Sequence, residues 1–458
     1  MKSFNALLVL VLLLTPALVA QSQSAGWHTW RGNDTTGVAP KSNPPTEWSE
    51  DKNVRWKIRI PGDGASTPVI VKDRIYVMSA VKTDRDGKPT AGKRPTSGRS
   101  GRSGRRGGRR GGRGMRGSRA PTKVWEFVVV ALDRKTGKEI WKKKVHEEVP
   151  HESGHRTGSQ ASNSPVTDGE HIYAFFGSRG VHCLDLDGEV KWSVDLGSLF
   201  TRNQFGEGSS PALHGDTLVV NWDHEGDSFI VALNKKTGKE RWRKERREST
   251  SWGTPTVAVV KGRPQVIITA TRASKAYDLK SGKELWSCGG MTANCIPTPI
   301  VKDGIAYLMS GFRGFSLQAI NLAAAKGDIT DTKAVKWSHG RNTSYVPSAL
   351  LYGDTLYFLR SNNAVLSCLD AKSGKVHYEG QRLDGLRTVY SSPVGAGGRV
   401  YITSRDGATK VFAHGSEYKE LASNKLDDTF DGSAAIVGNE IFLRGRKYLY
   451  CIGSKTTN

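Results

Sequence analysis

Short apolar runs separated by turn residues recur along most of the chain. One run begins after Ser164-Pro165, passes through the turn Asp168-Gly169, and resumes at His171 to Phe175. Runs of this length, rich in Val, Ile, Tyr and Phe and bounded by Gly, Pro or Asp, predict β-strands. We therefore expect an all-β chain built from many short antiparallel strands.

These strands are organised in a repeat of about 45 residues, which is the length of one four-stranded propeller blade. From Pro165 onward, successive prolines that open each unit are 44 to 48 residues apart. The openings lie at Pro68, Pro165, Pro211, Pro255, Pro299, Pro347 and Pro393, with a weakened copy at Ser433-Ala434.

A third and a fourth strand complete each unit. The third strand ends as in Ala131-Leu132-Asp133, the turn Lys135-Thr136-Gly137-Lys138 follows, and Trp141 opens the fourth strand. Glycine supplies the positive φ that such a tight turn needs. Because a tryptophan returns at one repeat position, we expect it to fill the same gap between blades each time. The series comprises Trp141, Trp192, Trp242, Trp286 and Trp337.

Eight units can be counted, and the last one stops near Gly453 without its tryptophan-bearing strand. Residues 54–60 form a fourth strand that no first three strands precede. Pairing the two halves would close the ring and remove a free sheet edge. The prediction is a single eight-bladed β-propeller over residues 27–453, closed by residues 54–60 against the C-terminal three strands.

The unit from Ala131 to Trp141, with near copies ending at Trp242 and Trp286, resembles the bacterial pyrroloquinoline quinone (PQQ) repeat family. The resemblance implies a quinoprotein alcohol dehydrogenase-like propeller. That family includes quinoprotein dehydrogenases, the propeller lipoprotein of the outer-membrane β-barrel assembly machinery, and exported propellers of unassigned role. The segments Trp30-Arg31-Gly32 and Phe176-Gly177-Ser178 are most similar to the last group.

The functional expectation is a non-catalytic binding or scaffolding propeller with an unassigned ligand. The alternatives are an oxidoreductase that uses PQQ and calcium, and an outer-membrane assembly factor that acts through protein contacts. The family's dehydrogenases typically carry a pair of adjacent cysteines, whereas this chain has none, and it lacks a haem-attachment motif. Glu207, Asn221, Asp223 and Asn294 could be nominated as calcium or base residues only by their position near strand ends. No cofactor is therefore predicted.

The N-terminus has the pattern of a secretory signal peptide over residues 1–24. Lys2 precedes the apolar run Ala6 to Leu14, and the small residues Ala17 and Ala20 follow. A cation, a short apolar core and a small-residue exit are typical of such leaders. We expect an exported protein of the periplasm or extracellular space. Because no cysteine precedes Cys183, a lipoprotein is not expected.

The formal net charge of +24 is concentrated in one segment. Residues 82–123 hold fifteen Lys and Arg against two Asp, a net +13, and their centre is an Arg-Gly-rich run. This composition predicts a disordered loop inserted in the first blade, on the face that carries the inter-blade connections. The candidate polyanion contacts are Arg105, Arg106, Arg109, Arg110 and Arg113. We expect a protein or an envelope polyanion as partner, a monomer, no transmembrane segment, and no intracellular nucleic acid.

The remaining candidates are cysteines, histidines and two isolated tryptophans. Cys183, Cys368 and Cys451 occupy a small packing position, whereas Cys288 and Cys295 flank one loop and are the candidate disulfide pair.

His146, His151 and His155 share a loop whose Pro150 and Gly154 oppose a helix, so no metal site is predicted. Asp223-His224-Glu225 is interpreted as surface. Trp222 and Trp252 lie outside the tryptophan series and are the candidates for lining a central pocket. No catalytic motif was found.

Overall fold

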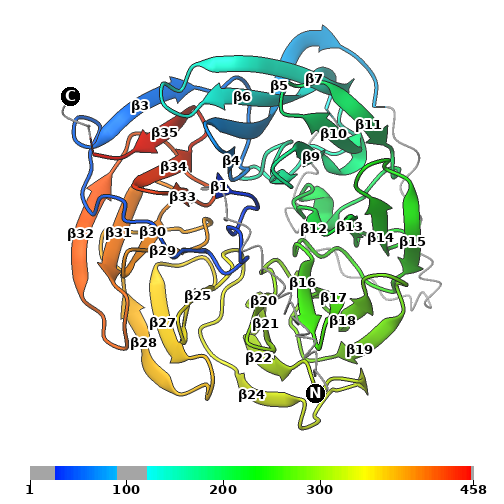
Figure 1. The fold of residues 1–458 in the computed structure, drawn as a ribbon, viewed down its shortest axis with the longest axis vertical. Helices are drawn as coiled ribbons and strands as arrows, with labels where there is room; N and C mark the ends of the chain where they lie inside the picture. Colours follow the sequence, from blue (N-terminus) through cyan, green and yellow to red (C-terminus); the bar gives the residue numbers. More distant parts are fainter. Residues whose placement is uncertain (1–25, 90–120, 455–458) are drawn as a thin grey trace, which may run out of the picture.

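The computed structural model describes residues 26–89 and 121–454. Eight sheets are arranged around a central axis, as expected for the eight-bladed propeller (Figure 1). Each blade has four antiparallel strands, which we number from the innermost outward. Within the described residues, no helix is long and apolar enough to cross a membrane.

Blade 1 contains β4 (Val69–Val71), β5 (Arg74–Asp86), β6 (Lys123–Asp133) and β7 (Glu139–Glu148), and blade 2 contains β8 (Val166–Thr167), β9 (His171–Phe175), β10 (Val181–Asp185) and β11 (Val190–Val194). Blade 3 contains β12 (Ala212–His214), β13 (Thr217–Trp222), β14 (Phe229–Asn234) and β15 (Glu240–Glu245), and blade 4 contains β16 (Thr256–Val260), β17 (Arg263–Ile268), β18 (Ser274–Asp278) and β19 (Glu284–Cys288). A short strand, β23 (Gly327–Asp328), pairs in parallel with β19.

Blade 5 contains β20 (Ile300–Lys302), β21 (Ile305–Ser310), β22 (Ser316–Asn321) and β24 (Val335–His339), and blade 6 contains β25 (Leu350–Tyr352), β26 (Thr355–Leu359), β27 (Val365–Asp370) and β28 (Val376–Arg382). Blade 7 contains β29 (Val394–Ala396), β30 (Arg399–Thr403), β31 (Ala408–Ala413) and β32 (Glu420–Lys425), and blade 8 contains β33 (Ala435–Val437), β34 (Glu440–Arg444), β35 (Tyr448–Ile452) and β3 (Val54–Arg59). The last strand closes the ring as predicted, because β3 pairs with β35 from Val54 to Arg59.

In three blades the turn between the third and fourth strands is closed by hydrogen bonds from its own side chains. In blade 1, the Asp133 carboxylate accepts hydrogen bonds from the Thr136 backbone N–H at 2.7 Å and the Thr136 hydroxyl at 2.6 Å. These two hydrogen bonds hold the turn closed, and Gly137 takes a φ of +73°. The same arrangement recurs at Asp278 with Ser281 and at Asp370 with Ser373. The repeated sequence motif is therefore a turn that carries its own hydrogen bonds.

The turn glycines also connect neighbouring blades. A Cβ added to any of five of them would lie 2.6 to 2.8 Å from a tryptophan ring of the preceding blade, so only glycine fits. The pairs are Gly137 with Trp56, Gly188 with Trp141, Gly238 with Trp192, Gly282 with Trp242, and Gly374 with Trp337. In these five pairs the indole N–H also donates to a carbonyl of the next blade. The prediction that the tryptophans fill the gaps between blades is confirmed.

Trp286 differs from the other tryptophans of the series in its hydrogen-bond partner. It is buried, and its indole N–H donates to the Gln265 side chain of its own blade at 2.9 Å. It still packs within the apolar cluster shared with Ala306, Leu308 and Ile320 of the next blade.

In every blade except blade 7, a small residue lies opposite the aromatic residue of the fourth strand. Cys183 pairs with Trp192, Cys368 with Tyr378, and Cys451 with Trp56. All three cysteines are buried free thiols, as expected for a small packing position.

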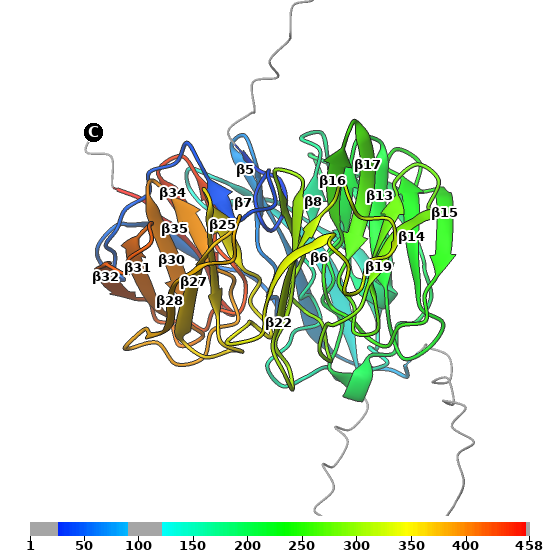
Figure 2. The same ribbon diagram turned by 90° about the horizontal axis from the view of Figure 1, so that it is seen from below.

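The two faces of the ring differ in their loops. Because strands alternate in direction, the second-to-third loops and the inter-blade connections lie on one face, which we call the mouth face. The other turns lie on the opposite face, which we call the back face. In Figure 2 the mouth face points downward, and the N-terminal segment (blue) lies along the back face.

The N-terminal segment crosses the back face and contacts three blades. Its two short strands are β1 (Gly26–Trp27), which pairs with β4, and β2 (Val38–Ala39), which pairs in parallel with β29. Between them, the buried Arg31 guanidinium donates to the carbonyls of Pro393 at 2.9 Å and Ala349 at 2.8 Å. Burial lowers the pKa of Arg31 to about 9. The segment thus links blades 1, 6 and 7 around the centre of the ring (Figure 1).

Two boundaries differ from the sequence prediction. Residues 82–86 belong to β5 and Lys123 to β6, so the predicted loop of residues 82–123 is too long at both ends. In blade 6, Ser348-Ala349 rather than Pro347 occupies the place of Ser164-Pro165, since Ser348 continues the hydrogen-bonded series described below. Residues 1–24, predicted as a signal peptide, lie outside the described residues.

Candidate functional site

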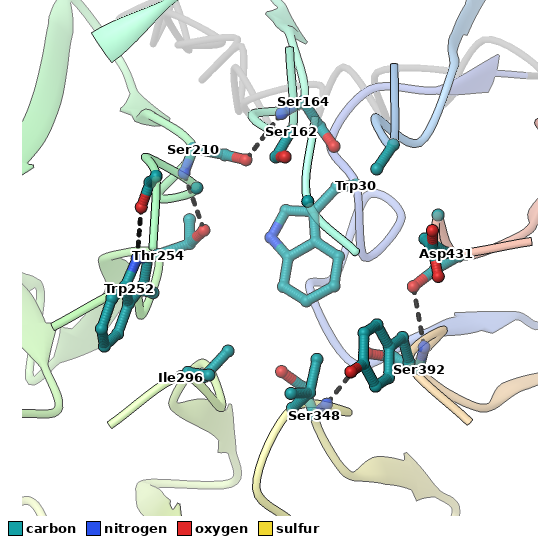
Figure 3. A pocket seen from close by; sticks show the side chains of 18 of the residues that line it. Trp30, Ser162, Ser164, Ser210, Trp252, Thr254, Ile296, Ser348, Ser392 and Asp431 are labelled. Atoms are coloured by element: carbon teal, nitrogen blue, oxygen red, sulfur yellow. Dashed lines mark hydrogen bonds between the residues drawn. The ribbon is translucent and has the colours of Figure 1, made fainter. Parts of the chain in front are cut away.

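A cavity of about 470 Å³ lies on the propeller axis. Except for Trp30, its lining residues belong to second-to-third loops, to inter-blade connections, or to the residues just before the innermost strands. The cavity therefore lies at the mouth face. Trp30 reaches it from the back face and occupies the centre of the view in Figure 3.

Eight hydroxyl residues surround the cavity, one from each blade, and we call them the hydroxyl ring. Each of the first seven has a backbone N–H that donates to the hydroxyl of the next, at 2.9 to 3.2 Å. The series is Thr67, Ser164, Ser210, Thr254, Thr298, Ser348, Ser392 and Ser433. Figure 3 shows several of these hydrogen bonds around Trp30. Because seven of these hydroxyl oxygens already accept a backbone N–H, their hydrogens are available to donate toward the cavity.

Aromatic side chains line the cavity together with the hydroxyl ring. Phe312 stacks on Tyr345 with ring centroids 4.7 Å apart. Trp252 is fixed by an indole hydrogen bond to the Gly206 carbonyl at 2.7 Å. Phe205 and Tyr390 complete the set. These rings offer flat apolar surfaces with polar edges to a bound ring.

Two carboxylates border the cavity, and arginine pairs with both. Asp431 is bound by Arg405 and by Arg446, the latter at 3.0 Å. Glu207 accepts a hydrogen bond from the Arg179 guanidinium at 3.0 Å and from the Ser178 hydroxyl at 2.7 Å. Neither carboxylate is therefore a free base or a free metal ligand.

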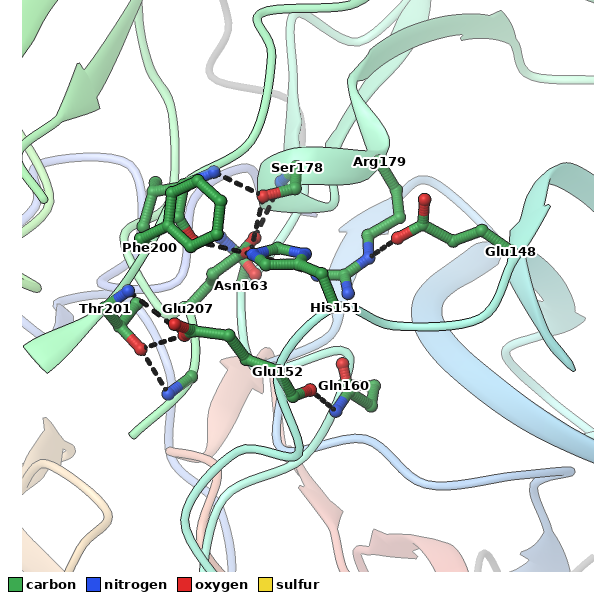
Figure 4. Close-up of polar contacts among 12 residues, drawn as sticks. Glu148, His151, Glu152, Gln160, Asn163, Ser178, Arg179, Phe200, Thr201 and Glu207 are labelled. Carbon is green, nitrogen blue, oxygen red and sulfur yellow. Dashed lines mark hydrogen bonds and ion pairs between the residues drawn. The ribbon is translucent and has the colours of Figure 1, made fainter. Parts of the chain in front are cut away.

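The Glu207 contacts extend into a polar network that runs from the end of blade 1 to the connection between blades 2 and 3 (Figure 4). Arg179 is 4% exposed and also donates to Glu148 at 2.6 Å. Burial opposes ionisation of Glu148, but contacts with His146 and Arg179 lower its pKa. Glu152 accepts hydrogen bonds from the Thr201 backbone and hydroxyl. The network fixes the connections that carry the cavity wall.

Of the two tryptophans predicted to line a pocket, the structure places one there. Trp252 lines the cavity, whereas Trp222 is 2% exposed and lies in the core of blades 2 and 3. Trp222 stacks on Phe229 at 5.5 Å and packs against Phe175. As the last residue of β13, it points into the sheet packing rather than toward the axis.

The surface assignment of Asp223-His224-Glu225 is wrong for the first two residues. Asp223 and Arg246 form an ion pair at 2.7 Å in which both side chains are fully buried. His224 is 5% exposed and holds the Phe200 backbone N–H through Nδ1. Two charges that pair in the interior are not visible as a pattern in sequence, because the residues lie 23 positions apart.

The nominated residues Glu207, Asn221 and Asp223 do lie close together. They line a small internal cavity of about 10 Å³ beside the main one. Arg179 and Arg246 neutralise the two carboxylates there. Asn294, the fourth nominated residue, is buried and does not line either cavity.

The disulfide proposed between Cys288 and Cys295 is not formed in this structure. Cys288 donates to the Gly289 carbonyl, and Cys295 to the Thr292 carbonyl. Burial raises the pKa of Cys288 to about 11 and that of Cys295 to about 12, so both are neutral thiols at pH 7. Each thiol has its own acceptor and packs in the same apolar cluster.

The prediction that three histidines share one loop is wrong for His146, which lies in strand β7. The described residues contain no group of three or more side chains arranged to hold a metal ion. His151 bonds the Leu199 carbonyl, and His155 packs edge-on against Phe205. Of the three, His155 lines the cavity. The candidate polyanion contacts Arg105, Arg106, Arg109, Arg110 and Arg113 lie outside the described residues.

The sequence prediction missed the hydroxyl ring and the role of Trp30. A Ser or Thr does open almost every repeat, but this pattern by itself indicates only the start of a strand. Trp30 gave no signal, because its place depends on a segment that crosses the back face of the ring.

The comparisons with known proteins agree with this architecture. The family model described as "Outer membrane protein assembly factor BamB" matches residues 125–288 and 226–457. No curated protein sequence matches significantly.

Three solved structures illustrate the similarity. BamB from Moraxella catarrhalis is 14% identical with a TM-score of 0.50, covering 73% of this chain and 92% of that one. A europium-containing methanol dehydrogenase is 11% identical with a TM-score of 0.61, covering 92% and 89%. A quinohemoprotein alcohol dehydrogenase from Comamonas testosteroni is 10% identical with a TM-score of 0.60, covering 94% and 81%.

These neighbours share the fold and include two dehydrogenases and BamB. The family match extends over most of the chain, from residue 125 to residue 457, and agrees with the repeat and the closed ring. The chain therefore belongs to the PQQ-repeat β-propeller family.

Proposed function

We propose that the chain is an exported, non-catalytic binding propeller whose ligand occupies the central cavity. The observation that carries this proposal is the chemistry of the wall. Aromatic rings and hydroxyl groups line the cavity, while both of its carboxylates are already paired with arginine. Such a wall can bind and orient a ligand, but it offers no free carboxylate base for proton transfer. The leader pattern of residues 1–24 supports export.

The residues present do not fit PQQ with a calcium ion, the cofactors of the family's dehydrogenases. Calcium takes several oxygen ligands, carboxylates among them. Here Glu207 and Asp431 are both occupied by guanidinium groups. No lysine or arginine is among the described residues that line the cavity, so the quinone carboxylates would meet no cation in the wall itself and could reach guanidinium groups only at the rim.

Calorimetric titration of the purified full chain with PQQ and Ca²⁺ tests this proposal. We expect no submillimolar binding, and no dye reduction when alcohols or aldoses are added. Submillimolar quinone binding together with alcohol- or sugar-dependent dye reduction would establish the oxidoreductase alternative instead.

A second candidate is scaffolding of outer-membrane proteins, which the family match favours. It predicts that the purified chain binds an unfolded outer-membrane barrel protein through its mouth-face loops. A titration in which the purified chain does not bind such a protein would argue against this role.

A further inference from the structure

Five arginines stand around the mouth of the cavity, and we call them the arginine collar. Each lies on a second-to-third loop or an inter-blade connection, so all five belong to the mouth face. They are Arg156, Arg202, Arg313, Arg360 and Arg405.

Two collar members lie over a cavity-lining ring, and two more influence the pKa of a lining side chain through their charge. Arg405 lies over Tyr390 at 4.6 Å, and Arg313 over Phe312 at 5.4 Å. Burial lowers the pKa of His155, and the charges of Arg156 and Arg405 lower it further. Burial raises the pKa of Tyr345, which the charge of Arg202 partly offsets.

The remaining member, Arg360, is two residues from the lining residue Asn362. Ring contacts therefore hold Arg313 and Arg405 at the rim of the cavity, and the other three members are placed at the mouth face by their loops.

Most of this charge is uncompensated. Within the described residues, Arg405 is the collar member that forms an ion pair, with Asp431. No described carboxylate pairs with Arg156, Arg202, Arg313 or Arg360, and all but the half-buried Arg202 are exposed. Since the two cavity carboxylates are neutralised by arginine, the mouth presents positive charge around a wall that is itself uncharged.

We propose that the mouth receives the end of an anionic polysaccharide, a sulfated or carboxylated glycan. This inference rests on the proposed binding role of the cavity. The terminal sugar stacks on Trp30 and Trp252 and takes hydrogen bonds from the hydroxyl ring. The collar guanidinium groups bind sulfate or carboxylate groups farther along the chain, in the paired geometry that arginine favours.

The arrangement of the rings favours a glycan over a nucleic acid. Single-stranded nucleic acids stack successive bases on aromatic residues spread along a groove. Here the rings converge on one deep cavity, where only a terminal unit can stack. The hydroxyl ring places donors around the whole perimeter, which suits a sugar ring with hydroxyl groups on all sides.

Calorimetry with a sulfated dextran oligosaccharide and its unsulfated counterpart of equal length tests the inference. The collar variant is Arg156→Gln with Arg313→Gln and Arg360→Gln, since these exposed side chains have no ion pair to break. A matched control removes the same charge from the back-face turns, as Lys135→Gln with Lys236→Gln and Lys280→Gln. The variant Ile296→Trp fills the cavity without altering the collar.

We expect the collar variant to weaken binding of the sulfated oligosaccharide at least tenfold and the lysine control less than twofold. The unsulfated oligosaccharide should bind more weakly, lose affinity in Ile296→Trp, and be unaffected by the collar variant. Equal losses in the collar and lysine variants would overturn the inference, because binding would then follow net charge alone.

Two further outcomes separate the inference from the proposed function. If single-stranded DNA of equal charge binds as tightly and depends on the collar, the glycan assignment is wrong although the cavity role stands. If Ile296→Trp leaves binding of both oligosaccharides unchanged, the cavity is not the site, and the proposed function fails with the inference.

Discussion

At the scale of single residues, tryptophan and glycine act as pairs at the blade interfaces. The indole of one blade covers the turn glycine of the next and donates its N–H to a carbonyl nearby. This contact explains why the motif demands glycine beyond the needs of its backbone conformation.

Two glycines of blade 4 separate these effects. Gly282 has a φ of +69° with the Trp242 ring 2.6 Å from its would-be Cβ, whereas Gly262 has a φ of +74° and an open surround. Gly262→Ala should cost about 1 kcal/mol of unfolding free energy, from backbone strain alone. Gly282→Ala should cost a further 1 to 3 kcal/mol or so from overpacking. Denaturant unfolding measures the unfolding free energy of both variants. If the two variants lose the same unfolding free energy, the contact between Trp242 and Gly282 does not require glycine.

The buried His182 predicts a pH dependence of stability. One ring nitrogen contacts the Arg179 carbonyl and the other the Ser193 hydroxyl, both at 2.8 Å, which suits a neutral imidazole. Burial lowers the pKa of His182 to about 4. The unfolded chain therefore binds the proton more readily between pH 6.5 and 4, and stability falls as the pH drops through that window.

From this group alone we expect a loss of about 2 kcal/mol between pH 7.5 and pH 5. His182→Gln keeps a neutral polar side chain and should remove that part of the pH dependence. Unfolding curves at the two pH values test this. If wild type and variant lose the same stability on acidification, His182 is not the responsible group.

At the scale of elements, the last blade depends on a strand contributed by the other end of the chain. Glu440 of β34 receives Arg55 from β3 and Arg134 from blade 1, the latter at 2.7 Å, and its side chain is 9% exposed. This shared carboxylate connects the closing strand, the last blade and the first.

Glu440→Gln should therefore lower the unfolding free energy by about 2 kcal/mol, because it weakens charge-assisted hydrogen bonds in a shielded site. Glu284→Gln is the control, since that residue pairs with Lys275 while 42% exposed. We expect the control to lose less than about 0.5 kcal/mol. Thermal and denaturant unfolding of both variants measure the difference. Comparable losses of unfolding free energy would show that the Glu440 ion pairs stabilise the protein no more than an exposed pair does.

Sequence patterns captured what is repeated and missed what is brought together over long distances. The strands, the turns and the tryptophan series follow a local period, so the eight blades and the closure at residues 54–60 could be predicted. The cavity wall could not, because its side chains come from eight inter-blade connections, two further loops and the N-terminal segment. The burial of Asp223 and the crossing of the back face by Arg31 likewise depend on partners far along the chain.

At the scale of the whole molecule, the net charge of +24 divides between two regions. Residues 90–120 contain eleven lysines and arginines and no acid. The backbone N–H of Gly87 donates to the Thr122 carbonyl at 2.9 Å, so the ends of β5 and β6 meet just before this segment.

Deleting residues 90–120 should therefore leave the propeller intact while lowering its formal net charge to +13. We expect an unchanged melting temperature and weaker, salt-sensitive binding to a heparin column, because fewer counterions are released. A large drop in melting temperature would show that the segment contributes to the fold. Undiminished heparin binding would show that it is not a polyanion contact.

The most direct test of the whole account is the location of a bound ligand in a crystal of the full chain soaked with a sulfated oligosaccharide. We predict a sugar ring in the central cavity against Trp30 and Trp252, with its sulfate groups toward the arginine collar. An empty cavity, with the oligosaccharide bound on the back-face lysine turns or the outer strands, would contradict it.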